Sequence, residues 1–146
     1  MDQSTYNAAN KARIALEHGA KTLVVVNGDK IVHHSVERGL VPLVDLATRL
    51  PEIAAGAVIG DRVVGRTAAL LAASLKPRAV FGLIMTDEAI DLLNEHGILA
   101  TWHETVPYLV ERGGGSRYKA DMAMAALNDP ALALTAIGHY LTGQEA

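Results

Sequence analysis

The segment Ala79 to Met85 constrains the fold more than any other part of the sequence, because it contains no charged or strongly polar residue. A strand that is apolar at successive positions has both faces covered, as in a parallel sheet with helices on each side. Helical spacing flanks this strand, with one helix expected from Asp61 to about Ser74 and another from Glu88 to His96. A strand between two helices predicts parallel pairing through right-handed crossovers, and hence an α/β fold.

The remaining elements complete the expected sheet. Thr22 to Val26 and Ile31 to His34 are β-prone runs on either side of Asn27-Gly28, a pair that accepts positive φ, so they predict an antiparallel hairpin. The other expected elements are a helix over residues 4–18 capped by Ser4 or Thr5, a helix over 40–50, strands over 57–59 and 98–103, and helices near 118–127 and 130–142. We therefore expect a three-layer α-β-α sandwich on a mixed, five-stranded sheet with an N-terminal antiparallel hairpin.

Length and charge limit the classes of function. A chain of 146 residues has the usual size of one domain, so we expect a single domain over 1–146, with its core at about 8–125 and C-terminal helices to about 142. The net charge is −3 and the 13 Lys and Arg residues are scattered, so no nucleic-acid binding is expected. The sequence shows no export signal and no apolar run of about 18 residues, which predicts a cytoplasmic protein without membrane contact.

Small apolar side chains dominate the expected core. Half of the residues are apolar, but the chain has only one Phe and one Trp, so alanine-rich helices must pack closely together. The same alanine-rich faces would serve subunit packing, and we expect a homo-oligomer.

Metal chemistry has little support in the sequence. The chain contains no cysteine, which excludes zinc-thiolate chemistry. His33 and His34 are neighbours on an expected strand and point to opposite faces, and no His-Glu-x-x-His spacing occurs. We therefore expect neither a metal site nor a cofactor.

The stretch from Gly60 to Thr67 is the first candidate site. It has the spacing of a phosphate-binding P-loop, but Arg66 stands at the lysine position and two adjacent valines make a poor phosphate-wrapping loop. A helix start capped by Asp61, with Gly65 allowing close packing, explains the stretch without a nucleotide triphosphatase. A milder hypothesis remains, in which Gly60, Asp61, Gly65, Arg66 and Thr67 form a pocket for an anion or a nucleotide at the carboxyl end of a central strand.

The glycine-rich segment from Arg112 to Arg117 is the second candidate site. Arg112, Gly113 and Gly114 could close over an anionic small molecule or nucleotide, with Arg117 and Lys119 as further donors. The alternative is a solvated connector.

Two carboxylates are candidates for a catalytic role. Asp61 and Asp87 fall at expected strand-to-helix junctions, where catalytic carboxylates tend to lie, and Arg66 is the cation beside the first of them. Both carboxylates are explained first as helix caps, with Thr86 as the alternative cap to Asp87. No serine lies in a nucleophile-elbow context, so acyl transfer has no support.

Several short motifs carry a resemblance to a known family. They are Gly60 to Leu71, Glu37-Arg38-Gly39 with Pro42-Leu43 just after it, Leu92 to Gly97, and Val106-Pro107-Tyr108. In this order, and over roughly residues 8–125, they resemble a bacterial and archaeal family of uncharacterised domains with the cytidine-deaminase-like fold. The resemblance implies that fold for this chain.

The same resemblance implies that deaminase chemistry is absent. Active deaminases bind zinc through a His-Ala-Glu type motif and a Pro-Cys-x-x-Cys motif at the starts of two successive helices, and the Glu moves protons. The resemblance places 63–66 and 85–88 at these positions, and neither stretch offers a thiolate or an imidazole. Arg66 keeps its proton at any relevant pH and cannot replace the Glu.

Three functional hypotheses follow from these observations. The first is a domain that binds a small molecule or a nucleotide-like anion. The second is an oligomeric structural or interaction module, and the third is a metal-independent hydrolase or transferase that uses Asp61 and Arg66.

Overall fold

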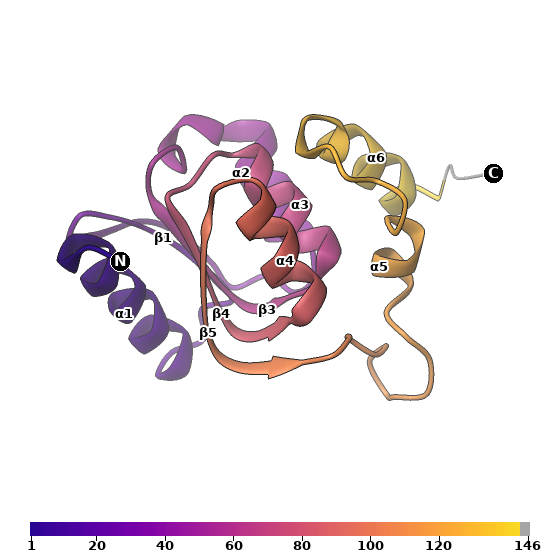
Figure 1. Ribbon diagram of the computed structural model, residues 1–146, viewed down its shortest axis with the longest axis horizontal. Helices are drawn as coiled ribbons and strands as arrows, with labels where there is room; N and C mark the ends of the chain where they lie inside the picture. Colours follow the sequence, from indigo (N-terminus) through magenta and orange to yellow (C-terminus); the bar gives the residue numbers. More distant parts are fainter. Residues whose placement is uncertain (144–146) are drawn as a thin grey trace.

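A five-stranded mixed sheet forms the centre of the protein (Figure 1). The computed structural model describes residues 1–143 of the chain. The strands, in the spatial order β2-β1-β3-β4-β5, are β1 (Leu23–Asn27), β2 (Lys30–Ser35), β3 (Val58–Val64), β4 (Ala79–Thr86) and β5 (Leu99–Val106). β1 pairs antiparallel with both β2 and β3, whereas β3, β4 and β5 are parallel. The parallel part of the sheet therefore coincides with the strands that helices connect, as the sequence predicts.

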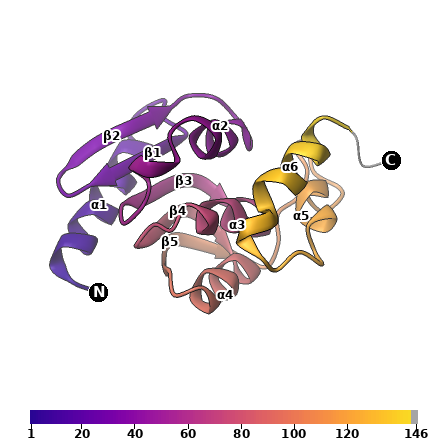
Figure 2. The same ribbon diagram turned by 90° about the horizontal axis from the view of Figure 1, so that it is seen from above.

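Helices cover both faces of this sheet. On one face lies α1 (Gln3–Glu17), which packs against β1, β3 and β4. The helices of the opposite face are α2 (Val41–Arg49), η1 (Pro51–Ile53), α3 (Arg66–Ser74) and α4 (Asp87–Glu95). Residues 107–143, which we call the C-terminal segment, contain α5 (Lys119–Ala123), η2 (Pro130–Leu132) and α6 (Ala133–Leu141). Figure 2 shows α1 on one side of the strands and α5 and α6 on the other, beyond α3. Within residues 1–143 no helix combines the length and apolar character needed to cross a membrane.

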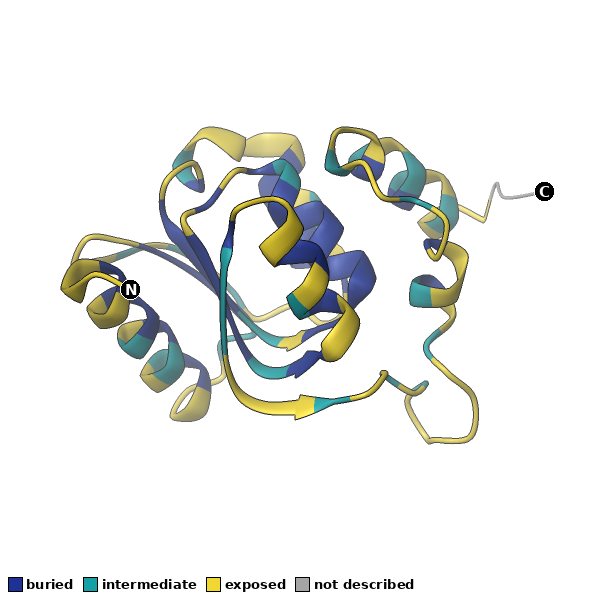
Figure 3. Cartoon of the chain, viewed as in Figure 1, coloured by how far each residue is buried: buried dark blue, intermediate teal, exposed yellow. Residues whose placement is uncertain are grey.

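The two faces of the sheet carry separate apolar cores. Beneath α1 the core is small. α1 lies so close to β3 that a Cβ added at Gly60 would be 2.8 Å from the Cβ of Ala12. The opposite core is larger and is centred on α3, where every residue from Arg66 to Ala73 is buried. Figure 3 shows this burial concentrated in α3 and the inner strands. Residues 68–73 are buried on every side of the helix, which explains why this part of α3 consists of alanine and leucine.

In β3 and β4 the regular alternation of side chains between the two faces of the sheet is interrupted partway along each strand. Ile59 and Val64 both face the larger core although they are five positions apart, and Val80 and Met85 do the same in β4. Strict alternation would place such pairs on opposite faces. Around the break, a Cβ at Gly82 would come 2.9 Å from the carbonyl oxygen of Ile84, so the backbone is tightly bent there. Because of this change of facing, Val64 at the end of β3 lies on the side of the larger core.

The predicted start of the helix after β3 is wrong. Asp61 does not cap a helix, because it lies in β3 with Leu23 as its partner on one side and Gly82 on the other. Both edges of its backbone belong to the sheet, so the N-cap is Gly65, four residues later than predicted, and the helix begins at Arg66. The predicted strand over 57–59 is the first part of a longer strand.

The caps of α1 and α4 compare differently with the sequence-based expectation. Asp2, and not Ser4 or Thr5, caps α1, since its carboxylate accepts the Thr5 amide hydrogen at 2.7 Å. At α4 the cap is one of the two expected candidates, the Thr86 hydroxyl, which accepts from the Ala89 amide at 3.1 Å. Asp87 is the first residue of that helix and does not cap it.

Candidate functional site

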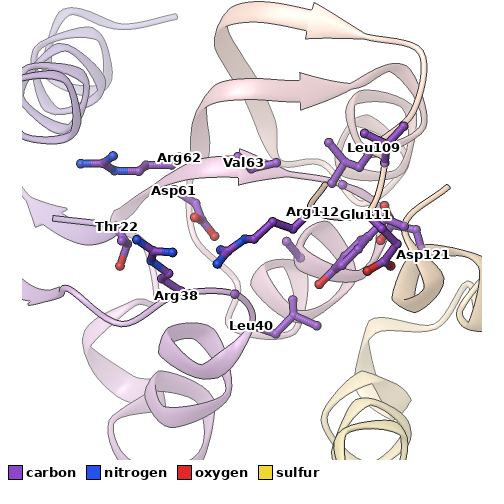
Figure 4. A pocket seen from close by; sticks show the side chains of 15 residues that line it. Thr22, Arg38, Leu40, Asp61, Arg62, Val63, Leu109, Glu111, Arg112 and Asp121 are labelled. Atoms are coloured by element: carbon purple, nitrogen blue, oxygen red, sulfur yellow. The ribbon is translucent and has the colours of Figure 1, made fainter. Parts of the chain in front are cut away.

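A cleft of about 540 Å³ opens where β3 ends. We call it the main cleft. Its walls come from the last residues of β3, from residues 38–40 before α2, from residues 109–112, and from Tyr118 and Asp121 (Figure 4). Ligands of open α/β sheets commonly bind outside the carboxyl ends of parallel strands, and this cleft has that location and a suitable volume.

Two arginines supply cationic groups to the main cleft. Arg38 precedes α2 and Arg112 follows the segment after β5, and Figure 4 shows their guanidinium groups directed toward one another. Both residues are exposed, and within residues 1–143 neither guanidinium makes a hydrogen bond or an ion pair. Their donors are therefore available to an anion.

Asp61 points into the space between these two arginines (Figure 4). Burial raises the pKa of its carboxyl group to about 7, although hydrogen bonds from the backbone N–H groups of Val63 and Arg62 act in the opposite direction. No cation of residues 1–143 lies within 4.0 Å of it. A carboxyl group in this state changes protonation near neutral pH and can either donate or accept a hydrogen bond.

A third arginine lines the main cleft but is already bound to the protein. The Arg62 guanidinium donates to the carbonyl oxygens of Lys21 and Gly19, both at 2.7 Å. Figure 4 shows it directed away from Asp61. The arrangement leaves Arg38 and Arg112 as the two cations that face the space of the cleft.

The other acidic groups of the main cleft have structural partners. Asp121 accepts hydrogen bonds from the backbone N–H of Thr67 at 2.8 Å and from its hydroxyl at 2.6 Å. Glu111 accepts from the Lys119 amide at 2.6 Å. Beside them, burial first and then the charges of Asp121 and Glu111 raise the pKa of Tyr118 to about 12, so its hydroxyl keeps its proton as a donor.

The main cleft contains three of the residues that the sequence singled out. Asp61, Gly65 and Arg112 line it, whereas Gly60, Thr67, Gly113 and Gly114 do not. Gly113 and Gly114 lie at the tip of a turn that is closed by the Glu111 amide donating to the Ser116 carbonyl oxygen at 2.8 Å. Asp87 is exposed at the start of α4, away from the cleft.

Arg66 has a different environment from the one expected. Its side chain is 7% exposed, and its guanidinium donates to the carbonyl oxygen of Met124 at 2.8 Å, to the Asn128 side-chain oxygen at 2.6 Å, and to the carbonyl oxygen of Leu127. The side chain therefore connects α3 to the C-terminal segment. The amide at the start of α3 is likewise occupied by the carboxylate of Asp121, which lies 54 residues further along the chain.

Sequence reasoning missed Arg38 and Tyr118 as residues of the site. Arg38 occurs in one of the motifs that carried the family resemblance, and it precedes Gly39, which has a φ of 71°. A cation beside a left-handed glycine in a connector is a weak local signal. Tyr118 has no such signal, since only the packing of α5 brings it to the cleft. Within the described part of the chain, no group of three or more His, Asp or Glu side chains is arranged to hold a metal ion.

The fold and the cleft define an α/β domain with a mixed five-stranded sheet, helices on both sides and a cleft at the end of its central strand. A solved structure has the same fold: the crystal structure of a DUF1893 family protein (TM1506) from Thermotoga maritima, with a TM-score of 0.83, 22% sequence identity, and coverage of 96% of this chain and 92% of that chain. The TM1506 domain of unknown function (DUF1893) matches residues 11–141, and the chain belongs to this family. No curated protein matches the chain.

Proposed function

We propose that the main cleft binds a small anionic molecule, such as a phosphorylated metabolite or a nucleotide. The observation that carries this proposal is the pair Arg38 and Arg112, whose guanidinium groups point into one cleft and have no partner within residues 1–143. Two cations held close together repel each other, and an anion between them removes that repulsion. Guanidinium groups also bind carboxylate or phosphate oxygens through two parallel hydrogen bonds.

The finer description of the fold belongs to the same proposal. We assign it to the cytidine-deaminase-like type, because an antiparallel β1–β2 pair precedes three parallel strands joined by helices. The starts of α2, α3 and α4, at residues 38–41, 65–67 and 86–88, contain neither Cys nor His. The zinc-dependent reaction of active deaminases is therefore not part of the proposed function.

Calorimetry and thermal unfolding with defined anions test the proposal. The probes are inorganic phosphate, ribose 5-phosphate and uridine 5′-monophosphate, each titrated at pH 6, where Asp61 is mostly protonated. A ligand at 100 times its Kd stabilises the folded state by about 2.7 kcal/mol. For a domain of this size the melting temperature then rises by about 5–10 °C.

Matched variants separate specific binding from general charge effects. We expect Arg38→Gln and Arg112→Gln each to weaken binding about tenfold or more, because each removes one charge-assisted contact. Arg49→Gln removes a similar exposed charge from the end of α2, outside the cleft, and should leave the affinity unchanged. If no probe shifts the melting temperature, or if both cleft variants bind like the unmodified protein, the proposal is wrong and the interaction-module hypothesis is favoured.

A catalytic role is a second candidate because of one observation, the near-neutral pKa of the Asp61 carboxyl group. A general acid or base works best when its pKa lies near the working pH. Arg66 has no part in this version, since its guanidinium is bound to the C-terminal segment and to the Glu88 carboxylate. For any substrate found among the anions that bind, Asp61→Asn should abolish turnover while leaving binding measurable, whereas unchanged turnover would exclude the role.

A further inference from the structure

A second, smaller cleft of about 120 Å³ adjoins the main cleft. We call it the side cleft. Leu109, Tyr118 and Asp121 line both clefts, so the two spaces adjoin one another along these three residues. The side cleft lies beyond the carboxyl ends of β4 and β5, next to the start of α4. The two spaces therefore follow one another along the same edge of the sheet.

The side cleft is lined differently from the main cleft. Pro107, Met122 and Ala125 give it apolar walls, and the ring of Tyr108 lies beneath the Arg117 guanidinium, 4.1 Å from its centre. Flat aromatic and guanidinium surfaces of this kind favour a flat group packed against them. An aliphatic or strongly hydrated group would make poorer use of these walls.

Polar groups at one end of the side cleft match the edge of a heterocycle. The buried Thr86 hydroxyl accepts from the Ala89 amide, and within residues 1–143 its own hydrogen has no acceptor. The exposed Glu88 carboxylate also lines the side cleft; it pairs with the Arg66 guanidinium at 3.4 Å and keeps further lone pairs that can accept a hydrogen bond. A donor and an acceptor in one cleft suit a ring that carries both a carbonyl oxygen and an N–H.

The size of the side cleft limits its occupant. Its volume is less than a quarter of that of the main cleft, about 120 against about 540 Å³. The smaller space suits a single ring.

We propose that the two clefts bind one ligand in two parts, with its anionic group between Arg38 and Arg112 and a single planar heterocyclic ring in the side cleft. The inference rests on the proposed function, because it takes the main cleft as the anion site. It deepens that function by naming the ligand class, an anion joined to a single ring, with the strip of Leu109, Tyr118 and Asp121 between the two parts. The anion supplies charge complementarity, and the ring supplies selectivity through shape and hydrogen bonds.

Paired titrations measure the contribution of the ring. Uridine 5′-monophosphate and ribose 5-phosphate carry the same anionic group and differ by one pyrimidine ring, so the ratio of their Kd values isolates the ring. We expect uridine 5′-monophosphate to bind at least tenfold more tightly. Equal Kd values for the two probes would overturn the inference while leaving the proposed function intact.

A filled side cleft gives an independent readout. In Ala125→Leu the larger side chain occupies space in the side cleft, so uridine 5′-monophosphate should bind about tenfold more weakly while ribose 5-phosphate binds as before. Ala123→Leu adds the same volume at an exposed position of α5 that lines neither cleft, and both affinities should stay unchanged. An equal loss for both probes in Ala125→Leu, or no loss for either, would contradict a separate ring site. If neither probe binds the unmodified protein, the proposed function fails together with the inference.

Discussion

At the scale of single residues, Asp61 links the site to the stability of the protein. Its carboxyl group has a pKa of about 7 in the folded state, because burial disfavours the charge, against 3.8 as the ordinary value. The folded state therefore binds this proton more tightly than the unfolded state does. As the pH rises from about 4 to 7, this group lowers the free energy of unfolding, by up to about 4 kcal/mol over the whole window.

The substitution Asp61→Asn removes this titration and keeps the shape of the side chain. We expect the variant to be more stable than the unmodified protein at pH 8, and the difference to shrink as the pH falls toward 4. Urea denaturation at a series of pH values measures both curves, with Asp91→Asn on the exposed face of α4 as the control. A variant that is less stable than the unmodified protein at pH 8 would show that the ionised carboxylate has a partner in solution.

Gly65 is required where the chain turns from β3 into α3. A Cβ at this position would overlap the Asp121 carboxylate and would come 2.7 Å from a Leu109 methyl group. Because Asp121 is held by Thr67, it cannot move aside freely. We expect Gly65→Ala to lower the free energy of unfolding by about 1–3 kcal/mol.

Gly138 provides a control with the opposite sign. It lies inside α6, and a Cβ there would meet no atom within 4 Å. Gly138→Ala should raise the free energy of unfolding by about 0.5–1 kcal/mol, because alanine loses less conformational entropy in a helix. Chemical denaturation of both variants decides the matter, and a stable Gly65→Ala would mean that the Asp121 cap is not fixed in solution.

At the scale of elements, the start of α3 depends on a residue from a distant segment. Gly65 has no side chain to cap the helix, and Asp121 supplies the missing carboxylate by accepting two hydrogen bonds from Thr67. A carboxylate at a helix start also interacts favourably with the helix dipole. We expect Asp121→Ala to lower the free energy of unfolding by about 1–3 kcal/mol, since it leaves the first turn of α3 without its cap.

A double-mutant cycle isolates the contact between Asp121 and Thr67. Thr67→Val removes the hydroxyl donor and keeps the amide, so its effect should be smaller than that of Asp121→Ala. In the double variant the two effects should fall short of additivity by about 0.5–2 kcal/mol. Full additivity would show that the two residues stabilise the protein independently.

Local sequence patterns predict most elements but not the details that build the site. The apolar run Ala79 to Met85 is strand β4 almost to the residue, because burial on both faces leaves a signal in every position. Gly60 and Asp61 have low strand propensity and typically mark a turn, yet β3 runs through them. The close approach of α1 favours glycine at position 60, and this requirement arises from a contact with Ala12, 48 residues earlier.

The candidate site shows the same limit. Asp61 and Arg112 are predicted because each stands out among its neighbours in sequence, one after an apolar strand and one before a glycine run. Their roles depend on Arg38 and Tyr118, which reach the main cleft only through packing. Arg66 was singled out for its place in a P-loop-like pattern, but its partners are two backbone carbonyl groups and the side chains of Asn128 and Glu88, which no sequence pattern identifies.

At the scale of the whole molecule, the C-terminal segment forms one wall of each cleft. Residues 109–112, Tyr118 and Asp121 face the end of β3 across the main cleft, and Figure 1 shows α5 and α6 set apart from the sheet, beyond α3. Ala133 and Ile137 of α6 are buried in the larger core. The site thus lies between two parts of the chain, and the geometry of the clefts depends on the contacts that hold these parts together.

Arg66 is the polar contact that fixes the C-terminal segment most directly. Its guanidinium donates to acceptors on Met124, Leu127 and Asn128, and a hydrogen bond to a charged donor contributes about 1.5–3 kcal/mol. Lysine keeps the charge but cannot reproduce the planar fork of donors. We expect Arg66→Lys to lower the free energy of unfolding by about 3 kcal/mol in urea denaturation.

Hydrogen exchange then shows which helices and strands lose protection in the Arg66→Lys variant. If Arg66 holds the C-terminal segment against α3, the amides of α6 in Arg66→Lys should exchange faster than in the unmodified protein, with β4 affected least. Arg13→Lys is the control, because Arg13 forms a surface pair with Glu17 on α1 at 2.8 Å and should change stability by less than about 1 kcal/mol. Uniform acceleration across β4 and α6 would show that the C-terminal segment unfolds only together with the sheet, so that the clefts open only when the whole protein does.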